Sequence, residues 1–263
     1  MPLHINYPAG EYGISAGTPS ELDCVIRTAD ISVGLFFCDF FEMTRCWFLD
    51  LDDTIYEASG GMLREIHLRM NDYIARTLNI SLEQAHALRS KYWATYGSTF
   101  IALWRLHRID PVDFLTKTHD FDPAPYIHYS GDVAADLSAL EGMKVVYTNG
   151  PRIYAQRVLE YLGITAVVDD LVCSTEMRLF GDWRPKPSAS MLLAQCARYG
   201  VNPAESVLVD DTWMNLKAAK AARLKTVWCT GYRLAHGRIT HRQAVAYVDA
   251  HVRHISELKK IRF

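Results

Sequence analysis

Two aspartates that directly follow an apolar run form the most reactive pattern in the sequence. Residues 47–54 read W-F-L-D-L-D-D-T, so a run suited to a buried strand ends in Asp50 and Asp52. Residues two apart on a strand share a face, and the chain must leave the sheet here, which lets the second carboxylate turn toward the first. Such a pair can divide the work of a nucleophile and a general acid–base.

Two later apolar runs also end in polar residues that could take part in chemistry. These residues are Thr148 and Asn149 after the first run, and Asp210 and Asp211 after the second. In a doubly wound parallel sheet, ligands bind beyond the carboxyl ends of the strands. We therefore expect these four residues to meet Asp50 and Asp52 at one edge of the sheet.

Short apolar runs alternate with longer helical patterns from Trp47 onward, which predicts an α/β fold with a parallel sheet. The predicted strands cover residues 47–51, 143–147, 206–209 and 225–229. About ninety residues separate the first two strands, although a parallel crossover needs only about a dozen. The predicted fold is therefore a doubly wound, Rossmann-like parallel sheet with an inserted segment.

The inserted segment, residues 56–138, has the pattern of an all-helical cap. Apolar residues recur in it at helical spacing, and Ser81 with Gln84 forms a predicted capping box at the start of one helix. We expect this cap to cover the active site. Residues 43–55 and 139–263 would then form the α/β core.

The first 42 residues fit this pattern least well. They contain four glycines and no sustained periodicity, and Met43 lies four residues before the first predicted strand. We expect residues 1–42 to form an irregular N-terminal extension. The extension either packs on the domain or is absent from a native protein that starts at Met43.

Charge and composition exclude several kinds of partner. The 28 basic and 30 acidic residues give a formal net charge of -2 in mixed order, which disfavours a nucleic acid polymer or an anionic membrane surface. The longest apolar stretch near the start, residues 31–41, contains Asp39 and is shorter than the roughly 20 residues that span a bilayer. The six cysteines include no C-x-x-C pair, so we expect reduced thiols and a cytoplasmic location.

Four motifs in order give the chain a resemblance to the haloacid dehalogenase-like hydrolase superfamily, from about Met43 to the C-terminus. They are D-x-D-x-T at Asp50, Asp52 and Thr54, the strand-ending Thr148 in V-V-Y-T-N-G, Lys186 in R-P-K-P, and Asp210 with Asp211 in V-L-V-D-D-T. The resemblance implies Mg²⁺-dependent hydrolysis of a small phosphomonoester through an aspartyl-phosphate intermediate.

The same resemblance implies a role for each residue. Asp50 would be the nucleophile and Asp52 the general acid–base, which argues against a dehalogenase because expulsion of a halide needs no general acid. Mg²⁺ would bind Asp50, Asp210, Asp211 and the backbone carbonyl of Asp52. The phosphate would bind Thr148, Asn149 and Lys186. An alternative role for Asp211 is to cap the helix that starts near Thr212.

Two segments resemble the helical-cap pyrimidine 5'-nucleotidases of that superfamily. They are Y-W-A-T-Y-G-S-T at residues 92–99 and M-R-L-F-G-D-W-R-P-K-P at residues 177–187. This closer resemblance implies UMP and CMP as substrates. The candidates to stack on the base are Tyr92 and Tyr96, together with Trp93 and Trp104. Aromatic residues at helical spacing more often pack in a core, which is the competing interpretation.

Two other functions are compatible with the motifs. One is a phosphatase for phosphoglycolate or for sugar phosphates, which would share the same catalytic residues. The other is a non-enzymatic binding module with the same fold, which is disfavoured because every catalytic position is filled. The sequence leaves the oligomeric state open.

Overall fold

The described chain is built around six parallel strands in the order β3-β2-β1-β6-β7-β8. They are β1 (Cys46–Leu49), β2 (Met143–Thr148), β3 (Asp170–Cys173), β6 (Val207–Asp210), β7 (Lys225–Cys229) and β8 (Ala250–Val252). The strand order runs outward from β1 in both directions, so the carboxyl end of β1 lies at a topological switch point of the sheet. This computed structural model describes residues 45–129, 131–237 and 245–263, and the predicted extension 1–42 lies outside them.

The sheet confirms the predicted fold class, with small shifts at the strand ends. β1 ends at Leu49, two residues earlier than predicted, although the Asp50 N–H still donates to the Val209 carbonyl at 2.9 Å. Asp210 is the last residue of β6, whereas the sequence predicted that Asp210 would follow the strand. The short strand β3 was not predicted.

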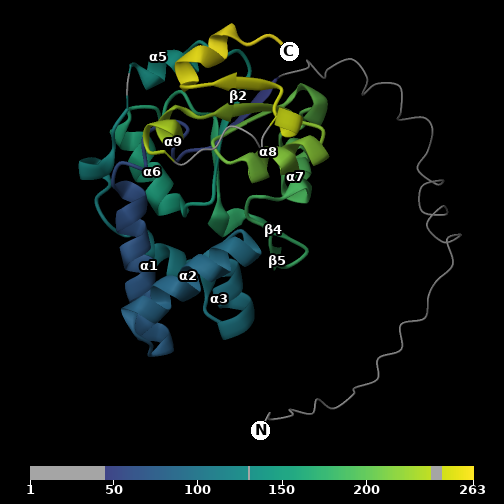
Figure 1. Cartoon of the computed structure of the whole chain (residues 1–263). Helices are drawn as coiled ribbons and strands as arrows, with labels where there is room; N and C mark the ends of the chain where they lie inside the picture. The colour runs from purple at the N-terminus through teal and green to yellow at the C-terminus, as the bar shows by residue number, and fades with distance from the viewer. Residues whose placement is uncertain (1–44, 130, 238–244) are drawn as a thin grey trace, which may run out of the picture. The chain divides into compact units, whose positions relative to one another are not determined.

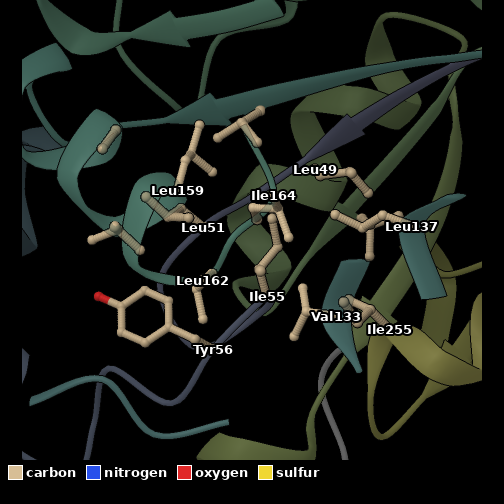
Figure 2. Packing of buried hydrophobic residues seen from close by; sticks show 14 of the residues in the cluster. Leu49, Leu51, Ile55, Tyr56, Val133, Leu137, Leu159, Leu162, Ile164 and Ile255 are labelled. Carbon is tan, nitrogen blue, oxygen red and sulfur yellow. The ribbon is translucent and has the colours of Figure 1, made fainter. Parts of the chain in front are cut away.

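Helices cover both faces of the sheet, and the alternation of side chains along β1 shows how. Leu49 belongs to the apolar cluster on one face and Phe48 to the cluster on the other. The first face packs against α5 (Val133–Ser138) and α6 (Arg152–Tyr161), and the second against α7 (Ala189–Tyr199) and α8 (Trp213–Ala221). Figure 2 shows the first cluster, where Leu49 and Leu137 lie near Ile255.

Short elements complete the core. They are the hairpin β4 (Arg178–Leu179) and β5 (Asp182–Trp183), the helix α9 (Gly231–Ala235), and the 3₁₀ helices η1 (Ala124–Tyr126), η2 (Ser174–Glu176), η3 (Pro203–Glu205), η4 (Val245–Tyr247) and η5 (Ile255–Lys260). The C-terminal stretch of the described chain forms the strand β8 (Ala250–Val252), which the 3₁₀ helix η5 follows.

Four helices inserted between β1 and β2 pack together around a cluster of their own. They are α1 (Met62–Leu78), α2 (Leu82–Tyr96), α3 (Thr99–His107) and α4 (Pro111–His119), hereafter the cap helices. Figure 1 shows α1, α2 and α3 side by side as one helical group. The predicted capping box is present, since the Ser81 hydroxyl accepts the Gln84 N–H at 3.1 Å and the Gln84 side chain accepts the Ser81 N–H at 2.9 Å.

The predicted cap range of residues 56–138 is too long at its end. It includes α5, but Val133 and Leu137 of α5 pack against the sheet in the same cluster as Leu49. The reason is that α5 returns the chain to the sheet just before β2 begins, so its apolar side has strand residues as neighbours.

Two further features of the described chain are the state of its cysteines and the character of its helices. The cysteines within the described residues are Cys46, Cys173, Cys196 and Cys229, and all four are free and buried. Among the helices of the described ranges, none combines the length and the apolar character needed to cross a membrane.

Candidate active site

A left-handed turn after β1 brings both motif aspartates to the sheet edge. Asp53 has a φ of 58°, a conformation that aspartate tolerates better than most residues, so the chain turns sharply away from the sheet at this point. The carboxylate of Asp53 accepts the N–H groups of Ala58 at 3.0 Å and of Ser59 at 2.7 Å. Asp53 therefore fixes the turn, while Asp50 and Asp52 line a cavity.

Lys186 forms the positive centre of the site. Its Nζ donates to Asp50 Oδ1 at 2.5 Å and to Asp210 Oδ2 at 2.9 Å, and the side chain is 4% exposed. Burial disfavours the charged ammonium, but attraction to Asp210 and Asp50 outweighs it and raises the pKa of Lys186. The lysine is thus a fixed cation at the carboxyl end of the sheet.

The side chain of Asn149 binds the backbone of the lysine loop. Its Oδ1 accepts the Lys186 N–H at 2.8 Å and its Nδ2 donates to the Lys186 carbonyl at 2.9 Å. Both polar atoms of the amide are therefore used on the lysine loop, because a side-chain amide matches the donor and acceptor of one backbone residue. The Asn149 side chain thus positions Lys186, and phosphate binding at Asn149 stays a prediction that its backbone N–H could fulfil.

Thr148 ends β2 at the wall of the cavity. Its Oγ1 accepts the Gly150 N–H at 3.0 Å, and both residues line the cavity. A Cβ on Gly150 would lie 2.9 Å from the Tyr154 ring, so a larger residue would push against the start of α6. The turn therefore keeps backbone amides close to the Thr148 hydroxyl, an arrangement that suits an anion.

Three buried carboxylates form a group that fits a hard cation. Oxygen atoms of Asp50, Asp210 and Asp211 all lie within 4.8 Å of one another. Mg²⁺ prefers such oxygen-only ligands, and the three carboxylates outnumber the two cations that pair with them, Lys186 and Arg233. The donor set thus fits the magnesium ion that the family resemblance implied.

The neighbours of Asp210 and Asp211 hold this group in place. Asp210 accepts the Thr212 N–H at 2.8 Å and both of its oxygens accept from Asn215 Nδ2, at 2.9 and 3.0 Å. Asp211 instead pairs with Arg233, whose Nη1 lies 3.0 Å from Oδ2. The alternative in which Asp211 caps the following helix fails, because the Thr212 N–H is bound by Asp210 and the helix begins at Trp213.

Mg²⁺ affinity is expected to fall as the pH is lowered. Burial, with added repulsion from Asp210, raises the pKa of Asp211 to about 7, so below that pH a bound cation must displace a proton. The association constant near pH 6 should be about ten-fold smaller than near pH 8, as measured by titration calorimetry. Asp211→Asn should bind Mg²⁺ more weakly, and its affinity should depend less on pH. A pH-independent wild-type affinity would contradict the assignment of Asp211.

Two tyrosines that the sequence did not single out hold Asp52. The hydroxyls of Tyr56 and Tyr154 each donate to Asp52 Oδ1 at 2.5 Å, and the two hydroxyls also contact each other. Among the described residues none is recorded as a partner of Oδ2, which leaves that oxygen to the cavity. Burial raises the pKa of Asp52 although the two tyrosine hydrogen bonds oppose the shift. A raised pKa suits a residue that must first donate a proton.

The cavity has a volume of about 680 Å³ and is lined by both core and cap helices. The residues from the cap helices are Leu63, Ile66, His67, Met70, Arg89, Ser90, Trp93, Ala94, Thr99, Phe100, Phe114, Leu115 and His119. Neither Tyr92 nor Tyr96 is among the described residues that line it. Tyr92 lies in the core of the cap with its hydroxyl 2.6 Å from His107 Nε2, and Tyr96 contacts the Tyr92 ring.

The prediction that Tyr92 and Tyr96 contact the base is therefore corrected, because neither side chain lines the cavity. Adjacent helical residues point about 100° apart, so when Tyr92 faces the cap core the neighbouring Trp93 faces the cavity. Sequence reasoning also missed Arg233, although it follows β7, the fourth predicted strand. The carboxyl end of that strand reaches the same edge of the sheet, which was the signal available.

The comparison with known families agrees with the motifs and the sheet. The sequence model of the haloacid dehalogenase-like hydrolases matches residues 44–223. The chain belongs to this family of hydrolases.

One curated relative is Validoxylamine A 7'-phosphate phosphatase from Streptomyces hygroscopicus subsp. limoneus, which is 27% identical over 126 residues. The match covers 47% of this chain and 54% of the relative, so the chain spans about half the length of the curated relative that it matches.

Solved structures share the fold at low sequence identity. A HAD phosphatase from Thermococcus onnurineus is 20% identical with a TM-score of 0.56, over 83% of this chain and 97% of that one. A 2-haloacid dehalogenase from Pseudomonas syringae pv. Tomato DC3000 is 18% identical with a TM-score of 0.53, again over 83% and 97%. The similarity concerns the fold, and it includes proteins named for two different reactions.

Proposed function

We propose that this hydrolase is a Mg²⁺-dependent phosphomonoesterase that acts through an aspartyl-phosphate on Asp50. The observation that carries the proposal is the convergence of Asp50, Lys186 and Asp210 within hydrogen-bonding distance at the switch point of the sheet. Asp50, Asp210, Asp211 and the Asp52 carbonyl would hold Mg²⁺, which when bound offsets the charges of the carboxylates and of the phosphate. Lys186 and Thr148 would bind phosphate oxygens.

The reaction divides into two displacements at phosphorus. A carboxylate oxygen of Asp50 attacks phosphorus, the bond to the ester oxygen breaks, and Asp52 gives its proton to that departing oxygen. Water then attacks phosphorus while Asp52 takes a proton from it, which releases phosphate and restores the Asp50 carboxylate. The hydrogen bonds from Tyr56 and Tyr154 would keep Asp52 oriented in both steps.

Asp52 also favours a phosphatase over a dehalogenase. Both names occur among the proteins with a similar fold, so the fold alone does not separate the two reactions. A halide leaves without a proton, whereas an alkoxide needs one. An aspartate with a raised pKa that lines the cavity is therefore expected in a phosphatase and has no use in a dehalogenase.

Pyrimidine nucleoside 5'-monophosphates are the substrates we propose. The cavity of about 680 Å³ can take a leaving group larger than a few atoms, and Trp93 offers an aromatic face in its wall. Phosphoglycolate and sugar phosphates are the second candidates, and a curated relative is named as the phosphatase of another phosphate ester, Validoxylamine A 7'-phosphate. We also infer that the cap helices select the substrate, and that the free, buried cysteines reflect a cytoplasmic location.

A panel of phosphomonoesters tests the substrate proposal. Phosphate release from UMP, CMP, AMP, GMP, phosphoglycolate and glucose 6-phosphate should give the highest kcat/KM for UMP and CMP, and chelation of divalent cations should stop release from all of them. A higher kcat/KM for phosphoglycolate or a sugar phosphate would contradict the proposed substrate, whereas the proposed phosphatase reaction would stand. Full activity after exhaustive chelation would contradict the metal requirement.

A further inference from the structure

Helix α2 presents a cation and an aromatic ring on the same wall of the cavity. Arg89 and Trp93 are four residues apart, which puts them one above the other on one face of a helix, and both line the cavity. The two side chains come from the cap helices, whereas the catalytic carboxylates come from the sheet edge. They are thus placed to contact the leaving group of a substrate that is bound at Asp50.

Arg89 is held in position, and no acidic side chain of the described residues pairs with its charge. Its Nε donates to Asn71 Oδ1 at 2.9 Å, and Asn71 is 8% exposed. Within the described ranges no aspartate or glutamate forms an ion pair with Arg89, and no hydrogen bond from its two Nη atoms is recorded. Burial lowers the pKa of Arg89, yet a guanidinium stays protonated at neutral pH.

An oriented and half-buried guanidinium whose Nη groups have no acceptor among the described residues indicates a ligand that supplies one. Desolvation of a charge costs free energy unless hydrogen bonds replace those to water. The anchored Nε fixes the plane of the guanidinium, so its remaining N–H donors form a flat fork that suits a planar acceptor. Trp93 adds a flat apolar surface one turn away, 52% of it exposed in the absence of ligand.

We propose that Arg89 and Trp93 form the base-binding subsite, in which the indole stacks on a pyrimidine ring and the guanidinium donates to its carbonyl oxygen. This inference rests on the proposed function and names the residues that choose the substrate. Uracil and cytosine share the O2 carbonyl next to the glycosidic bond, and adenine has no carbonyl oxygen. Stacking accepts any base, so discrimination against AMP falls to Arg89.

The test compares Arg89→Met with Arg64→Met, which makes the same chemical change on an exposed position of α1 outside the cavity. Ribose 5-phosphate has no base and serves as the reference substrate. Relative to its change for this reference, the kcat/KM of Arg89→Met for UMP and CMP should fall by about ten-fold or more. This is the loss expected when a hydrogen bond to a charged group is removed. Arg64→Met should match wild type on every substrate. Arg89→Lys keeps the charge and loses the planar set of N–H donors. Its kcat/KM for UMP and CMP should therefore lie between the values for Arg89→Met and Arg64→Met.

Binding gives a readout that does not depend on turnover. With Asp50→Asn in the background to prevent reaction, calorimetry should show weaker UMP binding when Arg89→Met is added and an unchanged affinity when Arg64→Met is added. An equal loss for UMP and ribose 5-phosphate would overturn the subsite, because Arg89 would then act on the phosphate or on the fold. A greater loss for phosphoglycolate than for UMP would also overturn it, since the acceptor would be a carboxylate.

Failure of this inference can be distinguished from failure of the proposed function. If wild type prefers UMP and Arg89→Met keeps that preference, the subsite is wrong and the nucleotidase proposal stands. If wild type hydrolyses other phosphomonoesters and no pyrimidine nucleotide, the proposed substrate fails and the subsite fails with it.

Discussion

Replacing Asp50 by Asn is expected to lower phosphate release from UMP by at least about 10⁴-fold, the scale seen when a catalytic nucleophile is removed. An amide nitrogen or oxygen is a far weaker nucleophile than a carboxylate, and Asp210, the other described carboxylate that contacts Lys186, already accepts hydrogen bonds from Thr212 and Asn215. The rate of phosphate release by purified protein with Mg²⁺ measures the effect.

The Asp50→Asn protein should remain folded. Asn has nearly the same shape, and Lys186 keeps its second partner, Asp210, at 2.9 Å. Asp72→Asn is the matched control, because Asp72 lies on the surface of α1 in an ion pair with Arg76. Turnover within ten-fold of wild type in a folded Asp50→Asn protein would exclude Asp50 as the nucleophile.

Replacing Asp52 by Asn should lower turnover of UMP by about 10²-fold to 10⁴-fold, the usual contribution of a general acid–base. The ribose oxygen is a poor leaving group without a proton, whereas p-nitrophenolate leaves readily. The loss for p-nitrophenyl phosphate should therefore be smaller than the loss for UMP, when both are measured as kcat/KM.

The leaving-group comparison separates chemistry from structure. Asn at this position can still accept the hydroxyls of Tyr56 and Tyr154, so the local packing should persist. Equal losses for the two substrates would count against proton donation by Asp52. They would indicate instead that the substitution disturbs the turn that carries Asp50.

Much of the candidate site could be predicted from the sequence because its residues lie at the ends of strands. Asp50, Thr148 and Asp210 lie at or just after the ends of β1, β2 and β6, which are neighbours at one edge of the parallel sheet. Apolar runs show where such strands end, and the topology of a parallel sheet then brings the ends together. The convergence of these residues is thus a consequence of local patterns.

Other features depend on contacts that no local pattern encodes. The sequence does not show that the side-chain amide of Asn149 binds the backbone of Lys186, 37 residues later. Tyr154 reaches Asp52 across 102 residues of sequence. Such pairings are set by how α6 and the lysine loop pack on the sheet.

The cap was the least predictable part in detail. α2 lacks a clear apolar stripe, with Ala85 and Tyr92 as its buried residues, so its orientation could not be derived from periodicity. A rotation by one residue decides whether Tyr92 or Trp93 faces the cavity. For the same reason the sequence did not point to Arg89, which becomes a candidate for substrate binding only when the orientation of α2 is known.

The central claim is that Asp50 becomes phosphorylated and that water then attacks phosphorus. A single turnover of UMP in water enriched in ¹⁸O, followed by mass spectrometry of the released phosphate and of the peptide that contains Asp50, tests it most directly. We predict ¹⁸O in the phosphate and none in the Asp50 carboxylate, with a phosphorylated Asp50 peptide in acid-quenched samples. Incorporation of ¹⁸O into Asp50 would show that water attacks the carboxyl carbon of an ester intermediate, and it would contradict the phosphatase mechanism.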